Sequence, residues 1–504
     1  MKRTYVSIVV LIAVMVVSFA LPTWAKSPQL KMTTTVPPGI KSPDKVNTRL
    51  GTLRFFDGFP DKPTVDKIYD NLDFQRAVQA YLLALPPVSM VGLREGLTQF
   101  GPANMTIPTF ETLMDSHSLF LTANANTPYT WMWINLHEGP LVAEIPLGVL
   151  GMINDFWFYY VTDLGITGPD KGKGGKYLVL PPGYKGEVPE GYLIIRMPTF
   201  EGFLGWRNFA VNGDFKPAIE NIKKFAHVYP LSQAANPPAN TFVNVSGKAF
   251  STVAPADYKF WEYLNEVVQK EPIGSLDQVT LGFYASIGIE KGKPFAPDAR
   301  MKKILTEAAA VGDATARALT FRMRKPSNYY YEHSAWCIPF SGGYKFEFQP
   351  GVRDLDAFSS FYFYATGVTP AMEAKMVGQG SQYAAAFVDS KSNPLDGGKT
   401  YKLHLPPNIP IKNFWSVIVY DNQTRSMIQT DQQYPMVTSQ NEKLQVNPDG
   451  SVDVYFGPKA PAGHEANWVQ TIPGKGWNTL LRLYSPLEAW FDKTWKPSEI
   501  ELVK

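Results

Sequence analysis

The sequence predicts a mixed α and β protein, predominantly β, in which two antiparallel β-sandwich-like modules are joined by a helical middle region. Short runs of aromatic and β-branched residues, bounded by Gly, Pro and Asn, occur in both halves of the chain. Segments with helical periodicity lie between them. A Phe-Trp pair followed by an Asp also recurs in both halves, and together these observations indicate two related, jelly-roll-like modules.

Composition sets the broad class. The chain has 504 residues, 45% of them hydrophobic and 18% charged, which is typical of a globular protein with two to four folding units. The net charge is only +3, so nucleic acid is excluded as a partner. Cys337 is the only cysteine, which excludes an intramolecular disulfide and a tetrathiolate metal site. We therefore expect no metal and no cofactor.

The N-terminus resembles an export signal. Lys2 and Arg3 precede an uncharged, largely apolar stretch that ends at Ala25. A positive region, an apolar region and a small residue at the cleavage site are the order of a secretory signal peptide, so we assign residues 1–25 to one and expect a periplasmic or secreted mature protein. The alternative is an uncleaved anchor, which would make the membrane a partner through this leader alone.

The elements expected before the first module are few. Residues 26–63 are rich in Pro, Thr and Lys and are expected to form an extended arm. Apolar positions from Val65 to Leu85 predict a helix that Pro86 and Pro87 end. We place the N-terminal β-rich module at residues 64–214, the helical middle region at 215–390 and the C-terminal module at 391–504.

Strands and helices follow from periodicity and punctuation. The strands expected in the first module are Tyr129–Leu136, Leu141–Ile145, Phe156–Thr162, Tyr177–Leu180 and Tyr192–Met197. The helices expected in the middle are Lys216–Val228, Asp257–Lys270 and Asp298–Lys325. The strands expected in the second module are Tyr401–Leu405, Phe414–Tyr420, Val452–Phe456 and Leu480–Tyr484.

The two β regions repeat a series of residues. Trp157 is followed by Asp163 and Trp415 by Asp421 at the same offset, which predicts that the two Trp are equivalent and buried. Both Asp are then expected to bind turn N–H groups rather than to act as a catalytic pair. An Arg-bearing strand follows in each half, with Arg196 in the first and Arg482 in the second. We interpret these arginines as buried ion-pair partners first and ligand clamps second.

The densest group of polar and aromatic residues is the segment from Thr122 to Trp133. Its candidate ligand-binding residues are Asn124, Asn126, Thr127, Tyr129 and Trp131. Amide, hydroxyl and phenol groups beside indole rings suit a sugar or another small polar ligand. The alternative is that these side chains only bind local backbone and set a turn into a strand.

No catalytic residue can be identified, because the common hydrolase, zinc-protease and phosphate-binding motifs are absent. His333 and Cys337 are four residues apart and would meet on a helix, but the apolar neighbours of Cys337 favour a buried, unreactive thiol. A pocket with His404 or His464 close to a carboxylate would indicate an enzyme.

Several of these motifs resemble two families of unknown function. Those of the first half are Asn124-x-Asn126-Thr127-x-Tyr129, Glu138 to Val142 and Gly175 to Gly183, which resemble domain of unknown function 1254. Those of the second half are Phe414 to Asp421, Asp449 to Val452, Asn467-Trp468, Arg482 to Tyr484 and Trp495 to Pro497, which resemble domain of unknown function 1214. The resemblance implies an exported bacterial β-sandwich protein with helices, in which Trp468 is structural. The first family has an acid where this chain has Asn126, so no catalytic role is carried over to that position.

Three functions remain open. The first is an envelope protein that binds a small polar or carbohydrate-like ligand in an aromatic-lined cleft. The second is a hydrolase or lyase with polar catalytic residues from both modules. The third is a structural envelope protein. Self-association into a homo-oligomer is compatible with each.

Overall fold

The computed structural model describes residues 30–211 and 213–503, so the expected signal peptide lies outside the described residues. The chain divides into two compact units, and the division falls between residues 70 and 71. Among the described residues, no helix is both long and apolar enough to cross a membrane.

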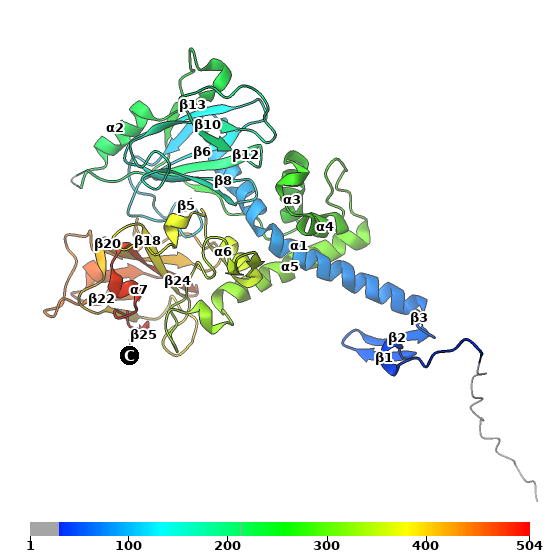
Figure 1. Cartoon of the computed structure of the whole chain (residues 1–504). Coiled ribbons are helices and arrows are strands. Elements are labelled where there is room, and N and C mark those ends of the chain that lie inside the picture. The colour runs from blue at the N-terminus through cyan, green and yellow to red at the C-terminus, as the bar shows by residue number, and fades with distance from the viewer. Residues whose placement is uncertain (1–29, 212, 504) are drawn as a thin grey trace, which may run out of the picture. The chain divides into compact units, whose positions relative to one another are not determined.

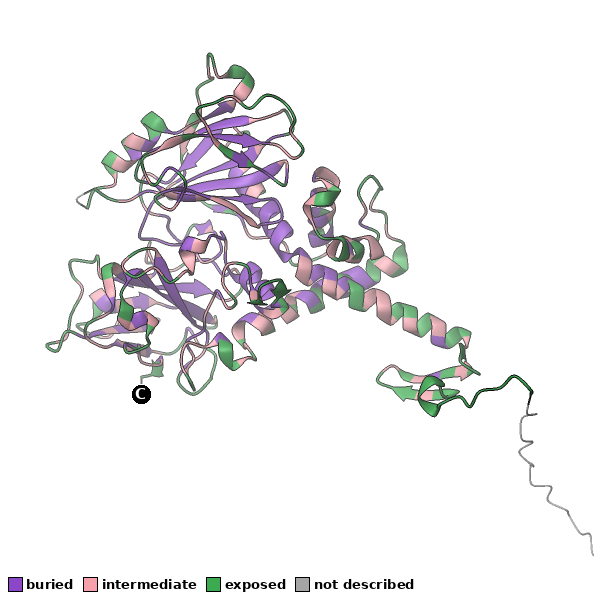
Figure 2. Cartoon of the chain, viewed as in Figure 1, coloured by how far each residue is buried: buried purple, intermediate pink, exposed green. Residues whose placement is uncertain are grey.

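The first unit contains a small sheet where we expected only an extended arm. Strand β1 (Lys45–Thr48) pairs antiparallel with β2 (Gly51–Phe56), and β2 pairs with β3 (Phe59–Pro60), after a short helix η1 (Pro38–Ile40). Gly51 begins β2 with a φ of 87°, a conformation that glycine adopts without strain. Figure 2 shows that these strands are largely exposed, unlike those of the second unit.

The predicted stop at Pro86 and Pro87 is wrong, because helix α1 runs from Lys62 to Thr98 with both prolines inside it. Pro87 has no N–H to give to the carbonyl of Leu83, and that carbonyl instead accepts a hydrogen bond of 3.1 Å from the Tyr284 hydroxyl. Residues 84–93 are also buried. Tertiary contacts therefore compensate for the bonds that the prolines remove.

Two sandwiches of the same topology make up most of the second unit (Figure 1). In the first, one sheet has the order β6-β12-β8-β9, extended beyond β6 by β4 and β14, and the other has the order β11-β10-β7-β13. In the second, the orders are β18-β24-β20-β21 and β23-β22-β19-β25. Strands β6 to β13 therefore correspond in chain order to β18 to β25. The directions agree as well, since only the β10–β11 and β22–β23 pairs are parallel within these corresponding sets.

The strands of the first sandwich and its neighbours are β4 (Thr106–Thr109), β5 (Ser118–Leu119), β6 (Tyr129–Asn135), β7 (Leu141–Ile145), β8 (Leu150–Asp155), β9 (Tyr160–Gly165), β10 (Gly175–Leu180), β11 (Leu193–Arg196), β12 (Glu201–Arg207), β13 (His227–Pro230), β14 (Thr241–Asn244) and β15 (Phe250–Ser251). The later strands are β16 (Glu347–Gln349), β17 (Val352–Arg353), β18 (Ser381–Ala386), β19 (Tyr401–Leu405), β20 (Ile411–Asp421), β21 (Met436–Thr438), β22 (Val452–Gly457), β23 (Trp468–Gln470), β24 (Trp477–Pro486) and β25 (Glu501–Leu502). The second sandwich thus begins at Ser381, ahead of the expected position 391.

Helices lie mainly between the two sandwiches in sequence. They are α2 (Lys216–Phe225), α3 (Lys259–Lys270), α4 (Gln278–Ser286), α5 (Ala299–Phe321), α6 (Leu355–Tyr364) and, near the C-terminus, α7 (Glu488–Phe491). The side chain of Asp298 caps α5 by accepting from Met301 N, as the expected start of that helix requires. Gly312 of α5 lies against the Tyr81 ring of α1 so closely that a Cβ would stand 2.3 Å from it. The two helices therefore need glycine at this contact.

Each sandwich has its own core, and a third core joins them. Alternate residues of β6 and β12 such as Met132 and Leu204 pack inside the first sandwich, and those of β20 and β24 such as Val417 and Leu481 pack inside the second. The opposite faces of these same strands carry Trp131, Phe203, Ile418 and Leu480, among others, into a large cluster with α1, α3, α5 and α6, which Tyr383 of β18 also joins. Both sheets therefore turn their second face toward a shared interior.

The pairing register corrects the residue equivalences expected from sequence. Asp421 ends β20 and pairs with Trp477, while the residue at the end of the corresponding strand β8 is Asp155, which pairs with Gly202. Asp163 lies on β9 instead. The expected strand Phe156–Thr162 is wrong at its start, because Phe156 to Tyr159 form the turn between β8 and β9. Trp157 and Trp415 are both buried but are not equivalent.

Candidate ligand-binding site

The same register brings two tyrosine–arginine pairs into equivalent places. Arg207 of β12 pairs across the sheet with Tyr129 of β6, five residues along β12 from the partner of Asp155. Arg482 of β24 pairs with Tyr383 of β18, five residues along β24 from the partner of Asp421. Each guanidinium lies over the ring of its own tyrosine, at 5.7 Å for Arg207 and 5.2 Å for Arg482. Both pairs lie on the strand faces that meet between the sandwiches.

Arg482 is held rigidly by uncharged oxygen atoms. Its Nη2 donates to the carbonyls of Thr122 and Ala123, at 2.5 and 3.3 Å, and to the hydroxyl of Tyr420 at 2.8 Å. The residue is only 3% exposed, and its Nε has no hydrogen-bond partner among the described residues. No described carboxylate forms an ion pair with it, so the predicted buried ion pair of Arg482 is wrong.

Arg207 and Tyr383 form the less saturated part of the site. Arg207 has no ion pair with any carboxylate that the structure describes, and it is half-buried because it borders internal space. The Tyr383 side chain is 5% exposed, and its hydroxyl makes no well-aligned hydrogen bond within the described chain. Burial alone would raise the pKa of Tyr383, but Arg207 and Arg482 outweigh burial and lower that pKa below its ordinary value.

Three adjacent cavities surround these side chains, and Arg207 lines all of them. The outer cavity has a volume of about 570 Å³, and its wall includes Asn126, Thr127 and Tyr484. The inner chamber, of about 70 Å³, is lined by Tyr129, Trp131, Tyr383 and other residues. A third chamber of about 50 Å³ reaches Arg482 and is called the Arg482 chamber below. Among the described residues that line these three cavities, only Arg207 and Arg482 are charged.

The five residues proposed from sequence to bind a ligand all lie at or next to these cavities. Tyr129 and Trp131 line the inner chamber, while Asn126 and Thr127 line the outer cavity. Asn124 lies behind the wall, where its Oδ1 accepts from Tyr484 at 2.8 Å and its Nδ2 donates to Thr127 at 2.8 Å. The structure therefore brings these residues together, and their role in binding remains a prediction.

The same loop also joins the two sandwiches. The Nδ2 of Asn126 donates to Thr438 Oγ1 at 3.2 Å and to Gln440 Oε1 at 2.9 Å. The Oδ1 of Asn126 is buried and has no partner among the described residues. Asn124 thus has a structural role, whereas Asn126 combines structural contacts with an unused acceptor beside the outer cavity.

The residues assigned to a shared structural motif separate into different environments. Arg196 lies exposed on the edge strand β11, so its predicted burial is wrong. Trp468 is half-buried on β23, and its indole N–H donates to the carbonyl of Gly457 at 2.9 Å. Asp163 accepts a hydrogen bond of 2.5 Å from the Thr369 hydroxyl, and burial raises its pKa. Thr369 lines the inner chamber, so Asp163 supports that wall instead of a turn.

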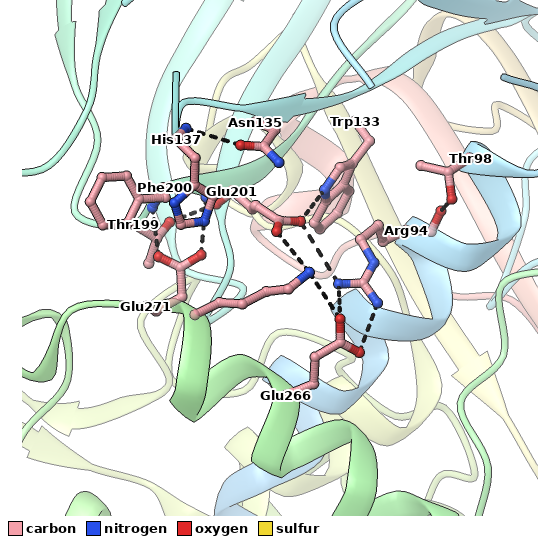
Figure 3. A network of polar contacts seen from close by, with 11 residues as sticks. Arg94, Thr98, Trp133, Asn135, His137, Thr199, Phe200, Glu201, Glu266 and Glu271 are labelled. Atoms are coloured by element: carbon pink, nitrogen blue, oxygen red, sulfur yellow. Dashed lines mark hydrogen bonds and ion pairs between the residues drawn. The ribbon is translucent and has the colours of Figure 1, made fainter. Parts of the chain in front are cut away.

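A second buried polar network shows how a charge is compensated elsewhere in this chain (Figure 3). Arg94 of α1 forms an ion pair of 2.7 Å with Glu266 and lies 3.8 Å from Glu201. Glu201 also accepts from Trp133 Nε1 at 2.7 Å and from Lys270 at 3.0 Å. These contacts tie α1 and α3 to the first sandwich. The carboxylates that accompany Arg94 have no counterpart beside Arg207 or Arg482.

Other candidates from the sequence do not form a site. Cys337 is buried, and burial followed by the nearby charge of Glu499 raises its pKa to about 12, while His333 is exposed. His404 does contact a carboxylate, with its Nδ1 2.7 Å from Asp453, but this pair lines none of the three cavities. The described residues contain no group of three or more His, Cys, Asp or Glu arranged to hold a metal ion.

Fold and site together define a protein with two β-sandwiches of one topology and an internal aromatic cavity between them. Two family models match parts of the chain: residues 104–230 match DUF1254, a protein of unknown function, and residues 380–488 match DUF1214, also a protein of unknown function. The resemblance expected from the motifs is confirmed in order and position. Arg207 and Tyr129 fall in the first family, and Tyr383 and Arg482 in the second.

Comparison with solved structures shows one likeness that supports the fold and one weaker likeness. The VPA0106 protein from Vibrio parahaemolyticus is similar over 86% of this chain and 100% of its own, with a TM-score of 0.52 and 20% sequence identity. An uncharacterised protein from Burkholderia cenocepacia is similar over 87% of this chain and 96% of its own, with a TM-score of 0.36 and 12% identity. No curated protein matches the chain in sequence.

The reasoning from sequence missed Arg207, Tyr383 and Tyr484. It compared Arg196 with Arg482 because each is followed by a proline and a glutamate. The equivalent of Arg482 by strand register is Arg207, which ends a strand that contains two glycines and has a weak β pattern. One pattern in the sequence could have indicated these residues: a tyrosine and an arginine recur in equivalent strands of both halves.

Proposed function

We propose that this protein binds a small molecule in the cavities between its two sandwiches. The observation that carries the proposal is a largely aromatic internal space with equivalent strands of both sandwiches in its wall, into which the Tyr383 hydroxyl projects without a well-aligned hydrogen bond. Ligand sites commonly occupy several hundred Å³ and combine apolar walls with a few convergent polar groups. The outer cavity, of about 570 Å³, falls within that size range.

Binding is favoured over hydrolysis or elimination by the composition of the walls. The three cavities contain no carboxylate, histidine or cysteine side chain in their walls. General acid–base chemistry usually depends on such groups. A purely structural envelope protein would not need a buried cavity lined by uncompensated polar groups, which are costly to keep.

A variant that fills the inner chamber tests the proposal. Thr366 lines the inner chamber and the Arg482 chamber, so Thr366→Phe should occupy that space. Thr306→Phe, on the exposed side of α5, is the matched control. Native mass spectrometry of protein from its own host should find a small molecule on the wild type and on the control, and none on Thr366→Phe. A wild type that carries no small molecule and is stabilised by none in a thermal-shift screen overturns the proposal.

We propose in addition that binding takes place outside the cytoplasm, on the basis of the charged and apolar leader before Lys26. Intact mass of the protein from its host should then show a chain that begins near Lys26. A chain that keeps Met1 and sediments with membranes would support the anchor alternative and contradict cleavage.

A further inference from the structure

We infer that the ligand of these cavities is a small organic anion whose carboxylate lies between Arg207 and the hydroxyl of Tyr383 in the inner chamber, with its apolar body in the outer cavity. This inference rests on the proposed function and names the class of molecule that the site accepts.

The charge of the site supports an anion. Arg207 and Arg482 are drawn out of bulk water without an ion pair from the described residues, and burial of an uncompensated charge is unfavourable. Arg482 at least donates to three oxygen atoms of the chain. Arg207 lines all three cavities instead, and beside its contact with the Tyr383 hydroxyl its planar guanidinium has further donors that can meet two oxygen atoms at once. A bound anion would supply the missing negative charge.

The number of donors favours a carboxylate. An ionised carboxylate accepts about four hydrogen bonds through its two oxygen atoms. Arg207 supplies a bidentate pair, and the Tyr383 hydroxyl and the Ser381 hydroxyl lie in the same inner wall. The lowered pKa of Tyr383 accords with a strong hydrogen-bond donor under the influence of two guanidinium groups.

The cavity dimensions divide the ligand into head and body. The inner chamber of about 70 Å³ has room for a head group of a few atoms, and Arg207 and Ser381 line it and the outer cavity alike. The outer cavity is much larger and presents the rings of Phe209, Phe215 and Phe414. An apolar body of the size of a phenyl ring or a short alkyl chain fits this wall.

Arg425 was the strongest competing candidate, since it is also buried without a described ion pair. Its guanidinium donates to the carbonyls of Phe363 and Gln423 and lies 4.2 Å over the Phe363 ring. The cavity beside it measures only about 20 Å³. Burial and the nearby charge of Arg317 lower the pKa of Arg425 to about 10. The small cavity beside it holds no more than about one water molecule, so Arg425 is not the centre of a ligand site.

The experiment compares charged probes with their neutral amides. Binding of benzoate and hexanoate, and of benzamide and hexanamide, is measured by calorimetry on the full chain. The variants are Arg207→Met, Arg207→Lys and Tyr383→Phe. The matched control is Arg196→Met, which removes an exposed arginine from the first sandwich. Circular dichroism melting of each variant verifies that it is folded.

We expect the wild type to bind the carboxylates at least about tenfold more tightly than the amides, because two charge-assisted hydrogen bonds are lost in the amide. Arg207→Met should abolish this preference, Arg207→Lys should keep part of it, and Tyr383→Phe should weaken carboxylate binding by about three- to tenfold. Arg196→Met should bind as the wild type does.

The outcomes separate this inference from the proposed function. Equal affinity for amides and carboxylates, or an unchanged preference in folded Arg207→Met, overturns the anion and leaves small-molecule binding intact. If the native protein carries a neutral molecule, the anion is likewise overturned and small-molecule binding stands. If it carries a carboxylic acid, the inference is supported even when none of the four probes binds. If no probe binds and the native protein carries nothing, both ideas fail.

Discussion

The first and second sandwiches place an aspartate at the same point, the end of β8 and of β20, but shift its pKa in opposite directions. Asp155 accepts from the N–H groups of Trp157 and Tyr159, each at 2.9 Å, and its burial raises its pKa to about 7. Asp421 accepts from Gln423 and Thr424, and burial opposes its charge too, but Lys475 at 2.8 Å and these N–H groups lower its pKa. The deeper burial of Asp155 and the lysine beside Asp421 together separate the two environments.

The two arginines differ in a similar way. Arg482 is fixed by chain oxygens, while Arg207 at the equivalent place borders the cavities. The repeated fold therefore conserves the position of this arginine, whereas the surrounding residues determine which groups it binds. The second copy binds the carbonyls of Thr122 and Ala123, and the first copy presents its donors to the cavities.

The largest effects should come from the two tryptophans, which are buried at places that do not correspond. Trp157→Ala and Trp415→Ala should each cost about 3–5 kcal/mol of unfolding free energy, because both leave a cavity in a packed core. The half-buried Trp468→Ala is the control and should cost less. Urea denaturation measures all three, and a cost for Trp157 no larger than that for Trp468 would contradict its place in the core.

The acidity of Asp155 should appear in the pH dependence of stability. Its folded pKa, about 7, lies above the ordinary value, so the protonated folded form is stable at low pH and stability is lost as pH rises toward and through about 7. The loss is on the order of 4 kcal/mol between about pH 4 and about pH 8. Asp155→Asn should remove this part of the dependence.

Glu271 should also lower the free energy of unfolding as pH rises over that range, because burial raises the pKa of its carboxyl to about 7. Asp155→Asn is therefore expected to flatten the curve of unfolding free energy against pH without making it level. The variant should match the wild type near pH 3, where Asp155 is protonated in both the folded and the unfolded chain, and exceed its stability increasingly as pH rises to about 8. Identical curves for the two proteins would show that Asp155 is charged in the folded chain at neutral pH.

The equivalent arginines should respond unequally to one substitution. Arg482→Met removes the donor that the Thr122 and Ala123 carbonyls and the Tyr420 hydroxyl share, although Ala123 still accepts from Tyr420, and should cost about 3 kcal/mol. Arg207→Met removes a charge without an ion pair and should change stability by less than about 1 kcal/mol. Thermal and urea unfolding of both variants measure the contrast, and a loss for Arg207 as large as that for Arg482 would mean that both are structural.

A small effect that depends on salt should be that of Asp421→Asn. An asparagine at this position can still accept from Gln423 and Thr424, so only the contact with the half-exposed Lys475 is lost. We expect a cost of about 1 kcal/mol at low ionic strength and nearly none in concentrated salt. Lys475→Met in parallel should give the same difference, and a cost that salt leaves unchanged would point to a packing defect instead.

The sequence by itself determined the class of fold and much of the strand pattern. Turn residues and alternating apolar residues placed Leu141–Ile145 and Tyr401–Leu405 as the structure has them, because such strands bury one face whatever their neighbours are. The same local rules singled out the loop that contains Asn126 and Tyr129. The two families of unknown function were also readable from short motifs.

Only the tertiary structure decided which residues share the site. Register between strands far apart in the chain pairs Arg207 with Tyr129 and Arg482 with Tyr383, and a shift of one residue would turn each side chain to the other face. Local sequence does not contain that register. Tertiary packing likewise explains why α1 continues past Pro86 and Pro87. The hydroxyl of Tyr284, far away in the sequence, donates to the Leu83 carbonyl, which Pro87 cannot bind.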